Sequence, residues 1–92
     1  MFRPDFIESD EDWVIWLLGG EFPGHATPGQ IIERTHFTSG QLDEAIRNLE
    51  RVKALRVIRI SGRFPPDNIE KVALQKYGET MFEELKLRST SE

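Results

Sequence analysis

Two similar segments that begin eleven residues apart constrain the fold of this chain more than any other feature. Their sequences are Thr27-Pro-Gly-Gln30 and Thr38-Ser-Gly-Gln41. Each has the form of a capping box, in which the Thr hydroxyl accepts a hydrogen bond from the Gln backbone N–H and the Gln side chain accepts one from the Thr N–H. The spacing leaves room for about two helical turns and a tight turn before the second helix. The pair therefore predicts a helix-turn-helix.

The periodicity of the apolar residues predicts the remaining elements. The expected helices lie near 11–18, 28–35, 39–54 and 76–87, and the expected strands of a β-hairpin lie near 57–61 and 69–74. Three helices, a hairpin and a last helix form an α+β domain with the element order of a winged helix-turn-helix. We expect this domain to span 9–87, between an N-terminal arm at 1–8 and a polar tail at 88–92.

The composition limits the classes of protein to which the chain can belong. Its 92 residues suit one small domain with a single core. The absence of cysteine excludes disulfides, thiolate metal sites and a cysteine nucleophile. The two histidines, His25 and His36, lack the helical spacing of a metal site, and no Ser-His-acid set or carboxylate pair stands out. We therefore expect no metal, no cofactor and no enzymatic activity.

The longest apolar run, 13–18, is too short to span a membrane, so the chain is expected to be soluble and cytoplasmic, without a membrane partner. Six consecutive apolar residues on a helix leave no polar face, so this helix is expected to be buried nearly all round. A monomer of this size has little surface with which to cover it. Phe2, Phe6 and Ile7 of the arm are expected to lie on this domain or on a partner. Together these features predict a homodimer that involves the first helix, the arm or the last helix.

Charge is unevenly distributed along the chain. The net charge is −4, yet residues 30–63 hold seven basic and four acidic side chains. The positive excess therefore falls on the helix-turn-helix and the strand after it. This is the segment that a winged helix would turn toward phosphates, although a chance distribution gives the same pattern.

The segment from Thr38 to Leu85 resembles the winged helix-turn-helix of MarR- and PadR-like transcriptional regulators, including small archaeal and viral versions. The resemblance rests on residues 49–58, which match the family's approach to the hairpin, and on residues 74–85, which match its last helix. Two positions differ, because Gln75 replaces the family's capping Thr and Arg56 replaces its helix-ending glycine. The resemblance implies a double-stranded DNA partner, with helix 39–54 in the major groove and the wing at 62–68 on the minor groove or backbone.

The polar face of helix 39–54 lies opposite its apolar stripe and carries Glu44, Arg47 and Arg51. Arginine is the commonest reader of guanine, and a carboxylate can accept from cytosine. The alternative is a solvated face on which Arg47 and Arg51 form ion pairs with Glu44 and Glu50. The residues predicted to contact DNA are Thr27, Arg34, Thr38, Ser39, Gln41, Glu44, Arg47, Asn48, Arg51 and Arg63.

The loop between the expected strands contains Arg63 and Phe64. Arg63 is expected to enter the minor groove or to contact the backbone. Phe64 is either a contact residue or part of the core, and we favour the core.

The acids Asp43 and Glu44 favour a second interpretation, in which the winged helix is a protein–protein interaction module of a replication, chromosome or transcription assembly. The two interpretations differ in the expected surface. DNA binding requires a continuous positive stripe across Arg34, Arg47, Arg51 and Arg63, whereas scattered charges favour protein contact.

Overall fold

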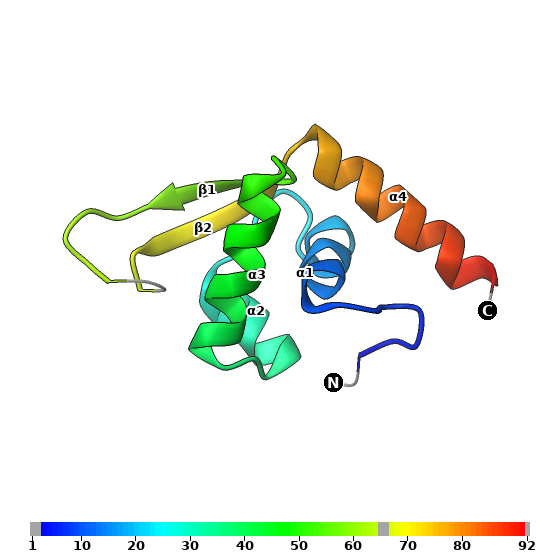
Figure 1. Ribbon diagram of the computed structural model, residues 1–92, viewed down its shortest axis with the longest axis horizontal. Coiled ribbons are helices and arrows are strands. Elements are labelled where there is room, and N and C mark those ends of the chain that lie inside the picture. The colour runs from blue at the N-terminus through cyan, green and yellow to red at the C-terminus, as the bar shows by residue number, and fades with distance from the viewer. Residues whose placement is uncertain (1–2, 65–66, 92) are drawn as a thin grey trace.

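The computed structural model describes residues 3–64 and 67–91. Its elements, in chain order, are α1 (Asp10–Gly19), α2 (Pro28–Thr35), α3 (Ser39–Arg51), β1 (Leu55–Arg59), β2 (Ile69–Leu74) and α4 (Lys76–Ser91). Helices α1, α2 and α3 gather at the centre, while the β1–β2 hairpin and α4 extend from the body on opposite sides (Figure 1). This arrangement is the α+β winged helix-turn-helix that the sequence predicts.

Both predicted capping boxes form. The backbone N–H of Gln30 donates to Thr27 Oγ1 at 3.2 Å, and that of Gln41 donates to Thr38 Oγ1 at 3.1 Å. Each Gln Oε1 accepts in return from its Thr N–H at 2.9 Å. The turn between the two helices is closed by His36, whose left-handed backbone ends α2. The helix-turn-helix thus follows from contacts between residues three apart in sequence.

Two helix ends differ from the prediction. Helix α3 ends at Arg51 rather than near residue 54, because Lys53 takes a left-handed backbone with φ of 64°. The Ala54 N–H then donates to the Leu49 carbonyl at 2.8 Å, and β1 begins one residue later. Lys53 thus supplies the left-handed backbone that ends the helix. In the family that the sequence resembles, a glycine at the position of Arg56 was expected to do this. Helix α4 continues to Ser91, so residues 88–91 of the expected tail are helical.

The wing is an antiparallel pair of strands. Leu55 pairs with Leu74, and Arg59 pairs with Ile69 after an irregularity in the register. The loop before α2 joins this hairpin through an isolated bridge, in which Ala26 and Val72 exchange two backbone hydrogen bonds of 2.9 Å. The helix-turn-helix and the wing are therefore linked through the backbone.

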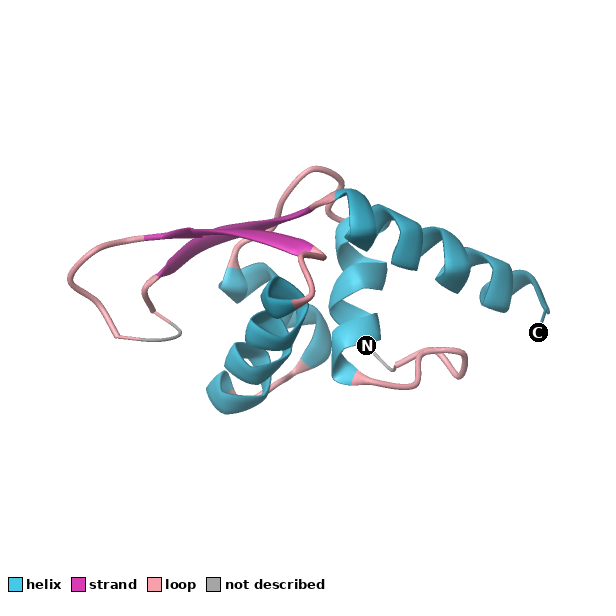
Figure 2. Cartoon of the chain, turned by 45° about the horizontal axis from the view of Figure 1, so that its top comes forward, coloured by secondary structure: helices cyan, strands magenta, loops and turns pink. Residues whose placement is uncertain are grey.

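The apolar helix α1 is covered within one chain. Its residues 13–15, 17 and 18 are buried against α3, α4 and β2. Trp16 is only partly exposed, because Phe6 of the arm meets its ring edge-on at 4.8 Å and Phe82 of α4 lies 5.4 Å away. Ile7 is 3% exposed. Figure 2 shows α4 running from the upper end of α1 out to the right, with the arm below it on the same side of α1.

The expectation that a monomer leaves α1 uncovered was therefore wrong, since the arm and α4 supply the missing cover. Ile7 belongs to the core of this domain and Phe6 packs against that core, while Phe2 lies outside the described residues. The burial of α1 therefore no longer supports a homodimer, which stays a prediction. No helix in the described ranges is long and apolar enough to cross a membrane.

Candidate nucleic-acid interface

The starts of α2 and α3 lie on the same face of the molecule as the wing loop. A groove of about 740 Å³ runs between them. Its walls include Thr27, Pro28 and Ser39 from the helix starts, and Arg63 and Phe64 from the wing. The helix starts carry the positive ends of the helix dipoles, so this side of the groove favours an anionic ligand.

The capping bonds determine which polar atoms at the helix starts are occupied. Thr27 and Thr38 use their hydroxyl groups for capping, and Gln41 uses its Oε1. The Nε2 amide of Gln41 makes no hydrogen bond with the part of the chain that the structure describes, so it can still donate to a ligand. Ser39 is exposed beside it.

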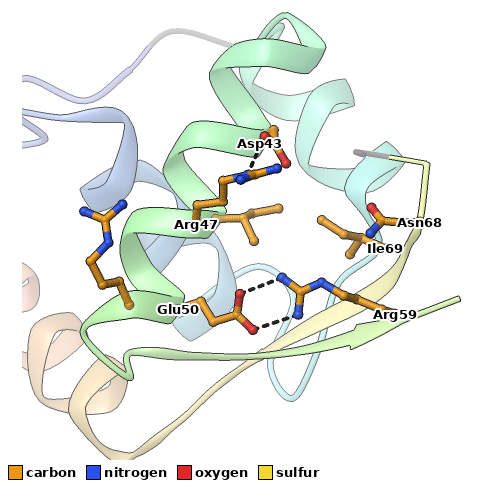
Figure 3. A pocket seen from close by; sticks show the side chains of 8 residues that line it. Asp43, Arg47, Glu50, Arg59, Asn68 and Ile69 are labelled. Atoms are coloured by element: carbon orange, nitrogen blue, oxygen red, sulfur yellow. Dashed lines mark hydrogen bonds and ion pairs between the residues drawn. The ribbon is translucent and has the colours of Figure 1, made fainter. Parts of the chain in front are cut away.

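A second hollow, of about 380 Å³, separates α3 from the wing (Figure 3). Across it, Arg59 of β1 donates to both carboxylate oxygens of Glu50, with distances of 2.8 and 2.6 Å. This bond to Arg59 lowers the pKa of Glu50 and raises that of Arg59. A two-pronged Arg–carboxylate contact fixes orientation as well as distance, so it sets the wing against α3.

Sequence reasoning missed this contact, because it paired Glu50 only with neighbours on its own helix. The pair joins residues nine apart that lie on different elements. The alternation of β1 is the only signal that could have placed Arg59 on the α3 side of the hairpin.

Arg47 lies on the exposed face of α3, as predicted. Its ion-pair partner is Asp43, four residues earlier, rather than Glu44. The bond is made by Arg47 Nε at 2.8 Å, while the side chain stays 59% exposed. Because the Nε bond holds the guanidinium from one edge, its terminal nitrogens can still donate to a base or phosphate.

Arg34 does not extend the positive face. Its Nε donates to Glu21, and Glu33 lies 3.6 Å from its Nη1. The guanidinium carbon is 5.7 Å from the centre of the Phe22 ring. The bond to Glu21 raises the pKa of Arg34. Arg34 is thus directed toward the loop between α1 and α2.

The other predicted residues of α3 differ in their surroundings. Asn48 is half-buried, with Nδ2 3.4 Å from Glu11 Oε1 on α1, so it is partly engaged inside the domain. Glu44 and Arg51 are exposed, and neither forms an ion pair with another described residue. The four arginines therefore do not share one uninterrupted positive stripe, because carboxylates offset Arg34 and Arg47.

The wing loop extends away from the body. Arg63 is exposed and has no ion pair among the residues described. Phe64 is 87% exposed, so the expectation that it packs on the core was wrong. Strand β1 ends at Arg59 and β2 begins at Ile69. The loop between them turns outward at Gly62, whose φ is 85°. The loop therefore carries the Phe64 ring beyond the apolar side chains that would cover it.

Comparisons with known proteins agree with this architecture. No known family model matches the sequence, and no curated protein is similar to it. Among solved structures, a point mutant of ZitR from Lactococcus lactis superposes with a TM-score of 0.66 at 13% identity, over 99% of this chain and 59% of that one.

The second structure is MepR, described as a transcription regulator of the Staphylococcus aureus multidrug efflux pump MepA. It superposes with a TM-score of 0.61 at 18% identity, over 89% of this chain and 58% of that one. The chain thus spans about three-fifths of the length of each. At these identities the likeness shows the fold, and it confirms the winged helix-turn-helix expected from the sequence resemblance.

Proposed function

We propose that this chain is a cytoplasmic, sequence-specific double-stranded DNA-binding protein that regulates transcription. The observation that carries the proposal is the groove whose walls combine the starts of α2 and α3 with Arg63 of the wing. A winged helix binds DNA with these same parts, a helix in the major groove and a wing on the neighbouring groove or backbone. The description of MepR as a transcription regulator adds support.

In this proposal the amino-terminal half of α3 enters the major groove. Arg47 reads a base or contacts a phosphate with its terminal nitrogens, and Arg51 contacts the backbone one turn later. Ser39 and the Gln41 amide lie near the base edges, and the exposed Glu44 can accept from cytosine N4. Arg63 binds in the minor groove or on its backbone.

The remaining predicted contacts are expected to be smaller. The backbone at Thr27 and Thr38 binds phosphate at the helix starts, because the hydroxyl groups serve as caps. Arg34 would have to give up Glu21, and Asn48 would have to give up Glu11, before either reached DNA. We therefore expect these two side chains to contribute least.

Selection from random duplexes, followed by fluorescence anisotropy at two salt concentrations, tests the proposal. The unaltered chain should enrich a defined sequence, and its affinity should fall steeply with salt. A variant with Arg47, Arg51 and Arg63 changed to Ala should lose this binding. Arg3→Ala, which removes one positive charge from the arm, should keep it. Failure of the unaltered chain to bind any duplex at low salt would reject the proposal.

The second candidate function is a protein–protein interaction module. The observations that favour it are the net charge of −4 and the carboxylates that offset Arg34 and Arg47. Under this alternative α3 and the wing contact a protein of a larger assembly, and the selection experiment enriches no sequence.

A further inference from the structure

Phe64 is the most exposed of the large hydrophobic residues in the described part of the chain. It is 87% exposed, whereas Ile60, at the base of the same loop, is 36% exposed. A single exposed apolar residue is ordinary on a protein surface. The position of Phe64 is what makes it informative.

The backbone of Phe64 is tied to the other side of the wing loop. The Asn68 N–H donates to the Phe64 carbonyl at 3.1 Å, and the Ile60 N–H donates to the Asn68 carbonyl at 2.6 Å. The wing therefore presents the ring from a defined place, beyond the end of both strands.

Phe64 shares a groove with the helix starts. Arg63 precedes it, and Pro28 and Ser39 line the opposite wall. A ligand that covers the helix starts therefore also meets the ring. Asp67 and Glu70 line the same groove, and their carboxylates would repel phosphate, so the phosphates of a bound strand should lie nearer to Arg63 or to the helix starts than to these two acids.

We infer that Phe64 is an apolar wedge that enters the minor groove of bound DNA and partly unstacks one base step. This inference rests on the proposed function. Proteins that bind the minor groove combine Arg with apolar wedges such as Phe, and the wedge kinks the duplex toward the major groove. Pyrimidine–purine steps unstack at the lowest cost. Phe64 thus selects a TA or CA step beneath the wing, at a position where no side chain hydrogen-bonds a base.

The test uses the full chain and the duplex enriched by selection, with 2-aminopurine placed in turn at each pyrimidine–purine step. Binding of the unaltered chain should raise the fluorescence at a step beneath the wing, because unstacking relieves quenching. Phe64→Ala should abolish this rise and weaken binding about tenfold, the scale of one lost base contact. Phe64→Leu, which keeps an apolar wedge, should retain part of both.

Two controls separate the wedge from other effects. Val52→Ala trims another exposed apolar side chain, 51% exposed at the carboxyl end of α3, and should change neither reading. On a duplex with a rigid A-tract at the unstacked step, the unaltered chain should bind with no higher affinity than Phe64→Ala, because that step resists unstacking.

The outcomes are distinguishable. If the unaltered chain binds DNA and Phe64→Ala gives the same affinity and the same fluorescence rise, the wedge is wrong and the proposed function stands. If the unaltered chain binds no duplex, both are wrong, and Phe64 is left as a candidate anchor for a protein partner.

Discussion

Arg47 and Arg63 occupy different surroundings, and their loss should have different effects on DNA binding. Arg47 is held by Asp43 against the exposed face of α3, so its terminal nitrogens have a restricted set of positions. Arg47→Ala should cost about 1–3 kcal/mol of binding free energy and relax the preference at one base pair per half-site. Affinity measurements on the selected duplex and on its single-base variants report both effects.

Arg63 lies on the exposed loop and has no ion pair among the described residues. Arg63→Ala should weaken binding to all sequences alike and lower the slope of log affinity against log salt by roughly one. Salt titrations of the variant and of the unaltered chain measure that slope. Unchanged affinities for both arginine variants would reject this binding surface.

Gly78 of α4 packs closely against the backbone of Ala54, just before β1, and against Leu74 of β2. A Cβ at this position would overlap the Ala54 carbonyl oxygen and lie 2.9 Å from a Leu74 methyl group. Alanine favours helices over glycine by about 1 kcal/mol, so helix propensity alone predicts stabilisation. The backbone contact cannot give way cheaply, and we expect Gly78→Ala to lower the free energy of unfolding by about 1–3 kcal/mol.

Urea unfolding measures this effect, with Gly40→Ala as the matched control. The nearest atom to a Cβ at Gly40 is Thr38 Oγ1 at 3.9 Å, so that change should be neutral or stabilising. Equal stability of the two variants would contradict the close approach.

At the scale of elements, Glu50 and Arg59 connect α3 to the wing. Because the native pKa of Glu50 is lowered by Arg59, the pair stabilises the fold above the unfolded pKa of glutamate and loses this effect as pH falls through the lower native value. Both side chains are more than a third exposed, so we expect less than about 1 kcal/mol. Glu50→Gln should be less stable than the unaltered chain at neutral pH and equally stable in strong acid. Urea unfolding across this pH range follows the difference, and a constant gap at all pH values would contradict it.

The elements that the sequence predicted well are those determined by near neighbours. The capping residues Thr27 and Thr38 act on atoms three positions away, so both helix starts could be read directly. The contacts that it missed join distant residues, such as Arg59 with Glu50 and Arg34 with Glu21. The local pattern of charges offers several partners for each arginine, and only the folded geometry chooses one.

The two errors about burial have the same origin. The arm and α4 cover α1. The periodicity of apolar residues within one segment does not show which other segments pack against it. Phe64 is apolar and lies beside prolines, which suits either a core or a contact residue. Its exposure depends on where the strands end, and strand ends vary more than helix caps in their sequence signals.

At the scale of the whole molecule, α4 extends from the body with exposed apolar side chains (Figures 1 and 2). Tyr77 is 51% exposed and Leu87 is 69% exposed. We propose that this helix contributes to a homodimer, which would also suit operators whose half-sites lie about one helical turn apart. Sedimentation equilibrium should show a dimer at tens of micromolar.

Leu87→Glu should weaken that dimer, because a charge would be buried in an apolar contact. Phe64→Glu is the control, since Phe64 is 87% exposed on the wing loop, and the wing and α4 extend from opposite sides of the body. A monomer at tens of micromolar would remove the proposal, and equal effects of the two variants would place the interface elsewhere.

The arm and α4 come together from distant parts of the chain. Arg88 Nη1 lies 3.4 Å from the Phe6 carbonyl oxygen, a contact between residues 82 apart in sequence. During synthesis, the ribosome therefore releases Phe6 and Trp16 long before the helix that covers them. Chains are made at about 5–20 residues per second, so these rings wait several seconds for Phe82. In that interval they are available to chaperones, and folding of the domain is completed only when α4 has emerged.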